Sequence, residues 1–227
     1  MRFRLATLLL SGSALVLAAC DDDDDDGPTQ PTQTAQIRVV NASGASVDVL
    51  SGTTSVTTAL AANTGSTSCF TVPAGSSTTL AFRAAGGTTN LATVTQTLTA
   101  NQRYTLVLTG TGATSTATLL ADATTDPTTG NNAIRFVNAT ATAGDVHVTT
   151  PTGTLGTATA AALAAGAATT TFITVPTANT RVRLFNAGTT TGTPRVDFTL
   201  PTLTGNRVAT VVLANPGTAT FVVTPCP

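Results

Sequence analysis

Few residues of this chain could do chemistry, and their types and spacing argue against catalysis. His147 is the single histidine, and the sequence contains no glutamate or lysine. General acid–base and nucleophilic catalysis need a base beside an activated group, most often His, Glu, Asp or Lys. Asp145 and His147 lie two residues apart on one expected strand, so both should point to solvent on the same face. Serine and threonine are so abundant that a neighbouring hydroxyl carries no information. We expect a solvated histidine and no enzyme.

Metal and cofactor sites are not expected either. A zinc site takes four ligands from Cys, His or carboxylate groups, and His147 has no second histidine to join it. The aspartate run Asp21 to Asp26 is an alternative place for calcium, but contiguous acids lack the alternating ligands and the turn glycine of a calcium loop. The glycines form no phosphate-binding fingerprint. The sequence therefore predicts no metal and no cofactor.

Cys20 follows a segment with the layout of an export signal. Two arginines precede an apolar run that ends at Ala19, and this run is shorter than the roughly 20 residues of a spanning helix. The residues Leu17 to Cys20 resemble the lipobox of bacterial lipoproteins. The resemblance implies a signal peptide over residues 1–19 that is removed and a diacylglycerol on Cys20, which would meet the need for two acyl chains. A simply cleaved signal with a chance cysteine is the alternative.

Residues 20–35 are expected to form a lipidated cysteine and a flexible, Asp-rich tether, because like charges repel and the following Pro-, Thr- and Gln-rich segment has little apolar surface. We expect a protein of the bacterial cell envelope that is lipid-anchored to a membrane and faces the periplasm or the cell surface. Asp21 resembles an inner-membrane retention signal, whereas acidic runs resemble surface-export signals, so the leaflet stays open. Beyond the tether, the sequence has eight arginines and five aspartates, without a basic cluster and with few aromatic residues. This composition argues against a nucleic-acid-binding protein.

Cys69 and Cys226 are the remaining cysteines. In an oxidising compartment we expect them to form a disulfide, which would bring the extreme C-terminus back to the first half of the chain. Two separate thiols are the alternative, since a bridge requires the two Cα atoms to lie within about 7 Å.

The chain contains an internal duplication, which fixed-offset comparison reveals. The sequence IRVVNA from Ile37 matches IRFVNA from Ile134, and TVP recurs at Thr71 and Thr174. Each unit has about 90 residues, over 36–125 and 133–227.

Apolar residues within each unit alternate in short runs bounded by Gly, Pro and Asn, which is typical of half-buried strands. The clearest runs are Leu80/Phe82, Tyr104/Leu106/Leu108, Val182/Leu184, Val196/Phe198/Leu200 and Phe221/Val223. Threonine makes up about a quarter of the chain, which also favours strands. The Ala-rich stretch from Thr157 to Ala168 is expected to be a strand with loops rather than a short helix. The fold prediction is all-β: two tandem immunoglobulin-like antiparallel β-sandwich domains after a signal peptide and an acidic tether.

The repeat also predicts two structural ion pairs. If the first two strands of each unit form a hairpin, Arg38 lies opposite Asp48 and Arg135 lies opposite Asp145. We expect outward, surface-exposed pairs; a binding arginine is the alternative. The two Asn residues that end the first matched strands satisfy the N-glycosylation pattern, but we expect them to form turns, because Asn hydrogen-bonds its own backbone there.

The segments IRVVNAS and IRFVNAT, TVPAG from Thr71, and NQRYTLVLTG from Asn101 resemble the bacterial domain of unknown function 4397, over nearly all of the chain after the tether. The resemblance implies an exported or lipid-anchored protein with one or two immunoglobulin-like units. It implies no activity, so no functional residues are carried over. The second unit departs from the pattern: Thr177 and Ala178 replace Ala-Gly after its TVP, and Ala209 replaces the tyrosine, which affects the turn geometry.

Two functions fit these features. The first is a non-catalytic, lipid-anchored cell-envelope protein that presents tandem immunoglobulin-like domains for protein interaction or adhesion. The second is a glycan- or cell-wall-binding module, which commonly uses exposed aromatic platforms. Two or more of Phe70, Phe82, Phe172 and Phe185 exposed in one groove would favour the second. A structural spacer is a further alternative.

Overall fold

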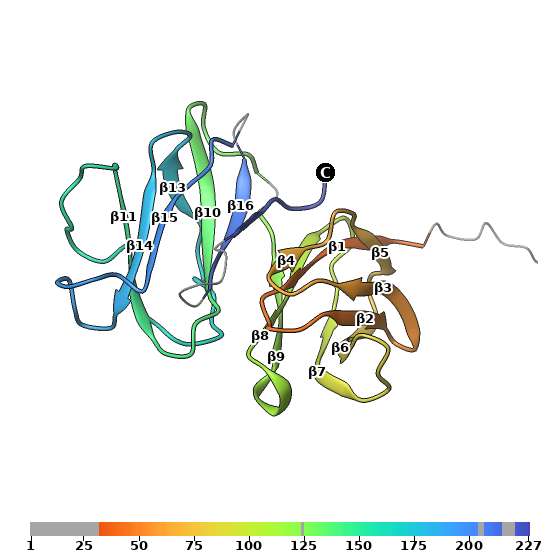
Figure 1. The fold of residues 1–227 in the computed structure, drawn as a ribbon. Helices are drawn as coiled ribbons and strands as arrows, with labels where there is room; N and C mark the ends of the chain where they lie inside the picture. Colours follow the sequence, from red (N-terminus) through yellow and green to blue (C-terminus); the bar gives the residue numbers. More distant parts are fainter. Residues whose placement is uncertain (1–31, 124, 204–206, 215–220) are drawn as a thin grey trace, which may run out of the picture. The chain divides into compact units, whose positions relative to one another are not determined.

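The computed structural model describes residues 32–123, 125–203, 207–214 and 221–227, and residues 32–227 form one compact unit. This part of the chain contains seventeen strands and one short 3-10 turn (Figure 1). It includes no helix with the length and apolarity needed to cross a bilayer. The predicted signal peptide, Cys20 and the aspartate run lie outside the described residues. The predicted tether ended at Ala35, but the first strand already begins at Thr34.

The first sandwich consists of two sheets. One has the strand order β4-β1-β8-β9, with β5 also paired to β1, and the other has the order β3-β2-β6-β7. The strands are β1 (Thr34–Asn41), β2 (Val47–Ser51), β3 (Thr54–Leu60), β4 (Thr64–Gly65), β5 (Phe70–Pro73), β6 (Ser77–Ala84), β7 (Asn90–Thr97), β8 (Arg103–Thr109) and β9 (Thr116–Ala121), with the 3-10 turn η1 (Gly112–Thr114) before β9.

The second sandwich also consists of two sheets, with the orders β13-β10-β16-β17 and β12-β11-β14-β15. The strands are β10 (Asn131–Asn138), β11 (Gly144–Thr149), β12 (Ala160–Leu163), β13 (Ile173–Pro176), β14 (Arg181–Asn186), β15 (Val196–Thr199), β16 (Val208–Leu213) and β17 (Phe221–Val223). The Ala-rich stretch contributes β12 and contains no helix, as the sequence predicted. The prediction of an all-β sandwich architecture is confirmed.

Each sandwich contains one parallel strand pair that the sequence did not predict. β1 runs parallel to β8 with Val39 opposite Leu106, and β10 runs parallel to β16 with Phe136 opposite Val211. The other strand pairings in the described residues are antiparallel. The duplicated segments therefore occupy equivalent positions in the two sandwiches.

The inward residues of each pair of sheets form an apolar core. The largest members of the first core are Ile37, Leu80, Phe82, Leu98, Tyr104, Leu106 and Leu108. Those of the second are Ile134, Phe136, Leu184, Leu200 and Leu213. Full burial of one such side chain contributes roughly 1.5–3 kcal/mol. Two separate cores explain why each repeat unit has its own alternating pattern.

The predicted hairpin between the first two strands of each unit is wrong, because β1 and β2 lie in different sheets. The Asn41 side chain accepts the backbone N–H of Ser43 at 3.0 Å and donates to the carbonyl oxygens of Leu60 and Ala61 at 3.0 Å. These bonds form a corner at which the chain crosses from one sheet to the other. Asn138 forms the same corner in the second sandwich. Alternation alone could not distinguish this corner from a hairpin, since both place the same residues inward.

The departure from the TVPAG pattern changes one turn without changing the fold. In the first sandwich, Gly75 has a φ of 83° directly after the turn begins. In the second, the turn is one residue longer and Asn179 supplies the positive φ, at 58°. Asparagine tolerates this left-handed region better than other non-glycine residues. The turn therefore keeps its left-handed residue without a glycine.

Candidate functional site at the seam between the sandwiches

The two predicted ion pairs, Arg38–Asp48 and Arg135–Asp145, do not form. In both cases the arginine and the aspartate lie on strands of different sheets. Arg38 instead donates from Nη1 to the carbonyl oxygen of Ser66 at 2.9 Å. The error follows directly from the hairpin, since strands that do not pair cannot place their side chains opposite each other.

Asp48 and Asp145 have the same structural role in the two sandwiches. Asp145 accepts the backbone N–H groups of Ala162 at 2.6 Å and Gly188 at 2.8 Å. Asp48 accepts two backbone N–H groups at equivalent positions, both at 2.8 Å. The bond from Ala162 is the main cause that holds the pKa of Asp145 below its usual range. Ala59 and Ala162, which donate to these carboxylates, have left-handed φ values of 49° and 47°. Each aspartate thus stabilises an irregular, strained strand.

His147 is buried, contrary to the expectation of a solvated side chain. It is 1% exposed, and its ring meets the edge of Phe185 with centroids 5.6 Å apart. Phe185 lies opposite Asp145 in the β11–β14 register, on the same face as His147. Among the described residues, neither ring nitrogen of His147 has a hydrogen-bond partner. His147 therefore makes no hydrogen bond to a hydroxyl of the described residues, the contact that a nucleophile–base arrangement requires.

Metal ligands do not gather in the part of the chain that the structure describes: no three His, Cys or Asp side chains there could hold an ion together. The two Asn residues of the glycosylation patterns, Asn41 and Asn138, are each 0% exposed. Their amides are engaged in the corners between sheets, which confirms the predicted turns.

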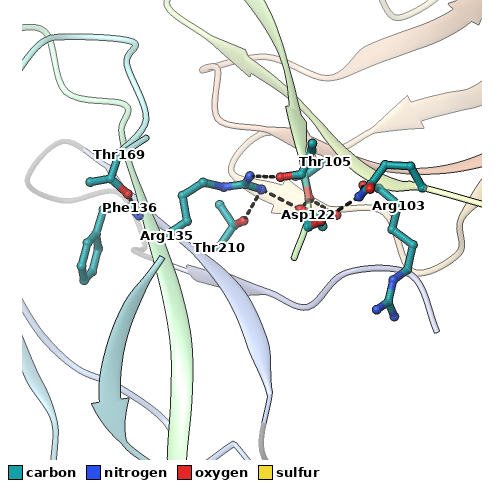
Figure 2. A network of polar contacts seen from close by, with 9 residues as sticks. Arg103, Thr105, Asp122, Arg135, Phe136, Thr169 and Thr210 are labelled. Atoms are coloured by element: carbon teal, nitrogen blue, oxygen red, sulfur yellow. Dashed lines mark hydrogen bonds and ion pairs between the residues drawn. The ribbon is translucent and has the colours of Figure 1, made fainter. Parts of the chain in front are cut away.

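A buried ion pair links the two sandwiches, and Figure 2 shows its side chains between strands of both. Arg135 of β10 donates from Nη2 to Asp122 Oδ1 at 2.7 Å, and the two side chains are 4% and 0% exposed. Thr105 of β8 donates its hydroxyl to both carboxylate oxygens, at 2.9 and 3.0 Å. Arg135 also donates to Thr210 Oγ1 at 3.0 Å and to the carbonyl oxygen of Ala121 at 2.8 Å. The network therefore joins β8, the end of β9, β10 and β16.

The electrostatics of this network reflect its burial. Removal from water raises the pKa of Asp122, because the desolvation cost exceeds the attraction of Arg135 and the hydrogen bond from Thr105. The Arg135 guanidinium also lies 5.0 Å from the ring centroid of Phe172, an arrangement that favours a cation over an aromatic face. Removing one partner of a buried ion pair typically costs about 3–5 kcal/mol. The network is therefore structural, and a change to one member should be felt by both sandwiches.

Apolar side chains surround the ion pair. Val40 of β1 and Val107 of β8 cluster with Val137 of β10 and Val212 of β16, together with Val223 of β17. The first four are at most 1% exposed. These side chains lie on the faces of the sheets that point away from the two sandwich cores. We call this contact, with the Arg135–Asp122 pair, the seam.

The disulfide between Cys69 and Cys226 reinforces the seam and confirms the predicted pairing. The two Cα atoms are 5.9 Å apart, across a sequence separation of 157 residues. The bridge attaches the last residues of the chain to the first sandwich, where Arg103 donates from Nη1 to the Cys226 carbonyl oxygen at 2.9 Å. Nearby, a Cβ at Gly65 would lie 2.9 Å from a methyl group of Val223. Only glycine allows β4 to approach β17 this closely.

A cleft of about 460 Å³ lies beside the seam. The two Asn corners contribute Ala42 to Gly44 and Ala139 to Ala141, the end of β8 contributes Thr109 and the start of β9 contributes Thr116. The lining residues are Ala, Gly, Ser, Thr and one Asn, with no charged or aromatic side chain. Both duplicated corners contribute to this cleft, whose volume is in the range of small-molecule sites.

Sequence reasoning missed the seam and the cleft. Asp122 has no acidic counterpart in the second unit, where the strand registers place Pro225 at the equivalent position, so the repeat comparison could not find it. One signal was available. The segments YTLVLT from Tyr104 and VATVVL from Val208 are apolar at successive positions, and such runs indicate strands buried on both faces.

Paired sheets, two cores and a shared seam define an all-β protein built of β-sandwiches. The chain belongs to the family described as Domain of unknown function (DUF4397), whose model matches residues 9–149, more than half of the chain. The match spans the whole first sandwich and extends to the end of β11. No curated protein matches the chain.

One similar solved structure is the crystal structure of CBMbc, of family CBM26, from Eubacterium rectale Amy13K in complex with maltoheptaose. It shares 13% sequence identity with this chain, and the alignment covers 86% of this chain and 98% of the other, with a TM-score of 0.26. A TM-score this low carries no argument about function.

Proposed function

We propose that this chain is a non-catalytic, lipid-anchored protein of the bacterial cell envelope, whose two sandwiches are tandem copies of one family domain and bind another protein. The observation that carries the proposal is the seam. It joins the two sandwiches by a buried ion pair, an apolar cluster and a disulfide. A surface that is ordered before binding loses less conformational entropy when a partner docks. Two sandwiches that are held together in this way therefore suit the presentation of loops to a partner protein.

The position of Cys20 supports the anchor. The first strand begins at Thr34, and a fully extended chain reaches about 3.3–3.6 Å per residue. A tether of this length would hold the folded part roughly 45–50 Å from the lipid at most. That distance suits a protein that acts beyond its own membrane surface.

The commitment of polar side chains to structure supports a non-catalytic role. The carboxylates of Asp48, Asp122 and Asp145 accept hydrogen bonds from backbone or side-chain groups of the fold. For the glycan alternative, none of the four phenylalanines Phe70, Phe82, Phe172 and Phe185 is exposed, so they form no aromatic platform. Protein interaction therefore remains the first candidate.

The anchor is tested by replacing the cysteine. In cells fed a radiolabelled fatty acid, the native chain should carry label and sediment with membranes, while a Cys20→Ser variant should carry none and leave the membrane fraction. A Cys226→Ser variant is the matched control, since it loses the disulfide and keeps the anchor. Equal labelling of the native and Cys20→Ser chains would refute the anchor.

The partner is tested in intact cells with a photo-cross-linking amino acid at Thr152, an exposed position in the loop between β11 and β12. We expect a reproducible cross-linked protein. The same amino acid at Val107, which is buried in the seam, should give no intermolecular product. If exposed positions on several loops recover no reproducible protein, the interaction proposal is wrong.

A further inference from the structure

The cleft beside the seam has walls that are held in place before any ligand arrives. In one wall, the Asn41 side chain binds the carbonyl oxygens of Ala45, Leu60 and Ala61. In the facing wall, the Thr140 hydroxyl donates to Asn138 Oδ1 at 2.6 Å. These bonds fix both corners, so a ligand would not have to order them. Preformed cavities of about 300–1,000 Å³ are typical of small-molecule sites, and this one measures about 460 Å³.

One hydroxyl in the cleft makes no hydrogen bond within the described fold. Thr109 is 3% exposed, it lines the cleft, and its side chain makes no hydrogen bond to any other residue in the described ranges. A Cβ placed on Gly166, another lining residue, would lie 3.1 Å from Thr109 Oγ1, so the hydroxyl is directed toward the cleft wall at Gly166. The oxygen itself is not fully buried, so the hydroxyl is open to the cleft and can hydrogen-bond to water or to a ligand there.

The second sandwich shows that the hydroxyl is not a requirement of the repeat. The equivalent position at the end of β16 is Ala214, which lines the same cleft from the other side. The strand pairing is the same in both copies, yet only the first copy carries the hydroxyl. Thr109 therefore belongs to the cleft and not to the shared architecture.

The chemistry of the walls selects the class of ligand. Because no lining side chain is charged, an ion would lose its hydration without gaining a counter-charge. A fully apolar ligand would leave the Thr109 hydroxyl and the Asn63 amide without partners. A sugar hydroxyl both donates and accepts hydrogen bonds, and so does a threonine hydroxyl. The small side chains of Ala139 and Gly166 leave room for a ring.

We propose that this cleft binds a neutral sugar residue and that Thr109 hydrogen-bonds to one of its hydroxyls. The proposal depends neither on the membrane anchor nor on a protein partner. Its failure and the failure of the proposed function are therefore distinguishable, because sugar binding is measured on purified protein without membrane or partner.

The test is an NMR titration of the purified protein with glucose, galactose and N-acetylglucosamine, each at millimolar concentration, a range suited to weak binding. We expect saturable shifts for one of them at Thr109, Gly110, Ala141 and Gly166. Thr109→Val removes the hydroxyl at nearly constant shape and should weaken binding about tenfold. Thr93→Val, at an exposed position on β7, is the matched control and should bind like the native protein.

Two further results guard the interpretation. Thr109→Val should melt at about the same temperature as the native protein, because the hydroxyl makes no hydrogen bond within the described fold, so a loss of binding could not be assigned to misfolding. Ala141→Phe, at an exposed lining position, should block the cleft and abolish the shifts. If none of the three sugars gives saturable shifts in the cleft, or if Thr109→Val binds as the native protein does, the proposal is overturned.

Discussion

Removing the disulfide should destabilise the whole molecule, because the bridge closes a loop that includes both sandwiches. With Cys69 and Cys226 separated by 157 residues, the chain-entropy expression gives a loss of about 17 cal/mol/K from the unfolded state, or about 5 kcal/mol at 25 °C. A domain of ordinary stability has only about 5–15 kcal/mol in total. The double variant Cys69→Ala/Cys226→Ala should therefore unfold at a much lower guanidinium concentration, while its folded-state far-UV circular dichroism stays unchanged.

The assay combines circular dichroism, which reports on both sandwiches, with the fluorescence of Tyr104. Tyr104 is the single tyrosine of a chain without tryptophan, and it is buried in the first core. Native protein reduced with dithiothreitol is the control and should match the double variant within about 1 kcal/mol. A loss below about 2 kcal/mol, the low end for a disulfide, would refute the reasoning, since it would mean that the two sandwiches do not unfold together.

Five further substitutions test the seam and the Asn and Asp side chains that have the same structural role in both sandwiches. Gly65→Val forces a side chain against β17 and should cost about 1–3 kcal/mol, as overpacking does; an unchanged thermal melt would contradict the close approach. Asn138→Ala removes the side-chain donor of the Leu163 carbonyl oxygen and the acceptor of the Thr140 backbone N–H, both in buried bonds, and should cost at least about 1–3 kcal/mol in urea unfolding; a neutral result would show that water replaces the amide. Asp145→Asn should destabilise at neutral pH. Because the folded-state pKa of this carboxyl lies below its unfolded value, near 3.9, its stabilisation is present above that value and disappears as the pH falls through the folded pKa, so acid titrations of variant and native protein should converge. Arg135→Met alone should cost about 3–5 kcal/mol, whereas Arg135→Met with Asp122→Leu should recover most of that loss; a double variant whose loss equals the sum of the two single losses would show that the two side chains are not coupled.

The sequence was informative wherever one short-range pattern determined the structure. Alternation located the strands around Phe82 and Leu184 because one face of each contacts a core. The repeat comparison found the units because equivalent residues, such as the two aspartates after the corners, have kept equivalent backbone partners. The disulfide followed from the compartment that Cys20 implied. Each of these inferences depends on a local or a pairwise feature.

The pairing of the strands could not be predicted from such local or pairwise features. Val39 and Val47 point inward whether their strands form a hairpin or lie in facing sheets, so the hydrophobic pattern is the same in both cases. What distinguishes them is the hydrogen bonding of Asn41, which depends on Leu60 and Ala61, nineteen and twenty residues later. The burial of His147 is a similar case, because alternation says which residues share a face and not whether another segment covers it.

The seam combines near-symmetry with one asymmetric contact. It places β1 and β8 of the first copy against the equivalent β10 and β16 of the second, with valines at matching positions. Arg38 and Arg135 are equivalent, yet of the two only Arg135 forms an ion pair, because Asp122 follows β9 and the strand registers place Pro225 at the corresponding position of the second sandwich. Apolar contacts alone would allow the two similar sheet faces to pack in several alignments relative to each other. A buried ion pair contributes little net stability, since desolvation offsets its attraction, but a misplaced partner would leave a charge buried alone. The pair therefore acts against wrong arrangements more than it stabilises the right one, and the divergence of the two copies at this position is what gives the duplicated surfaces a single register.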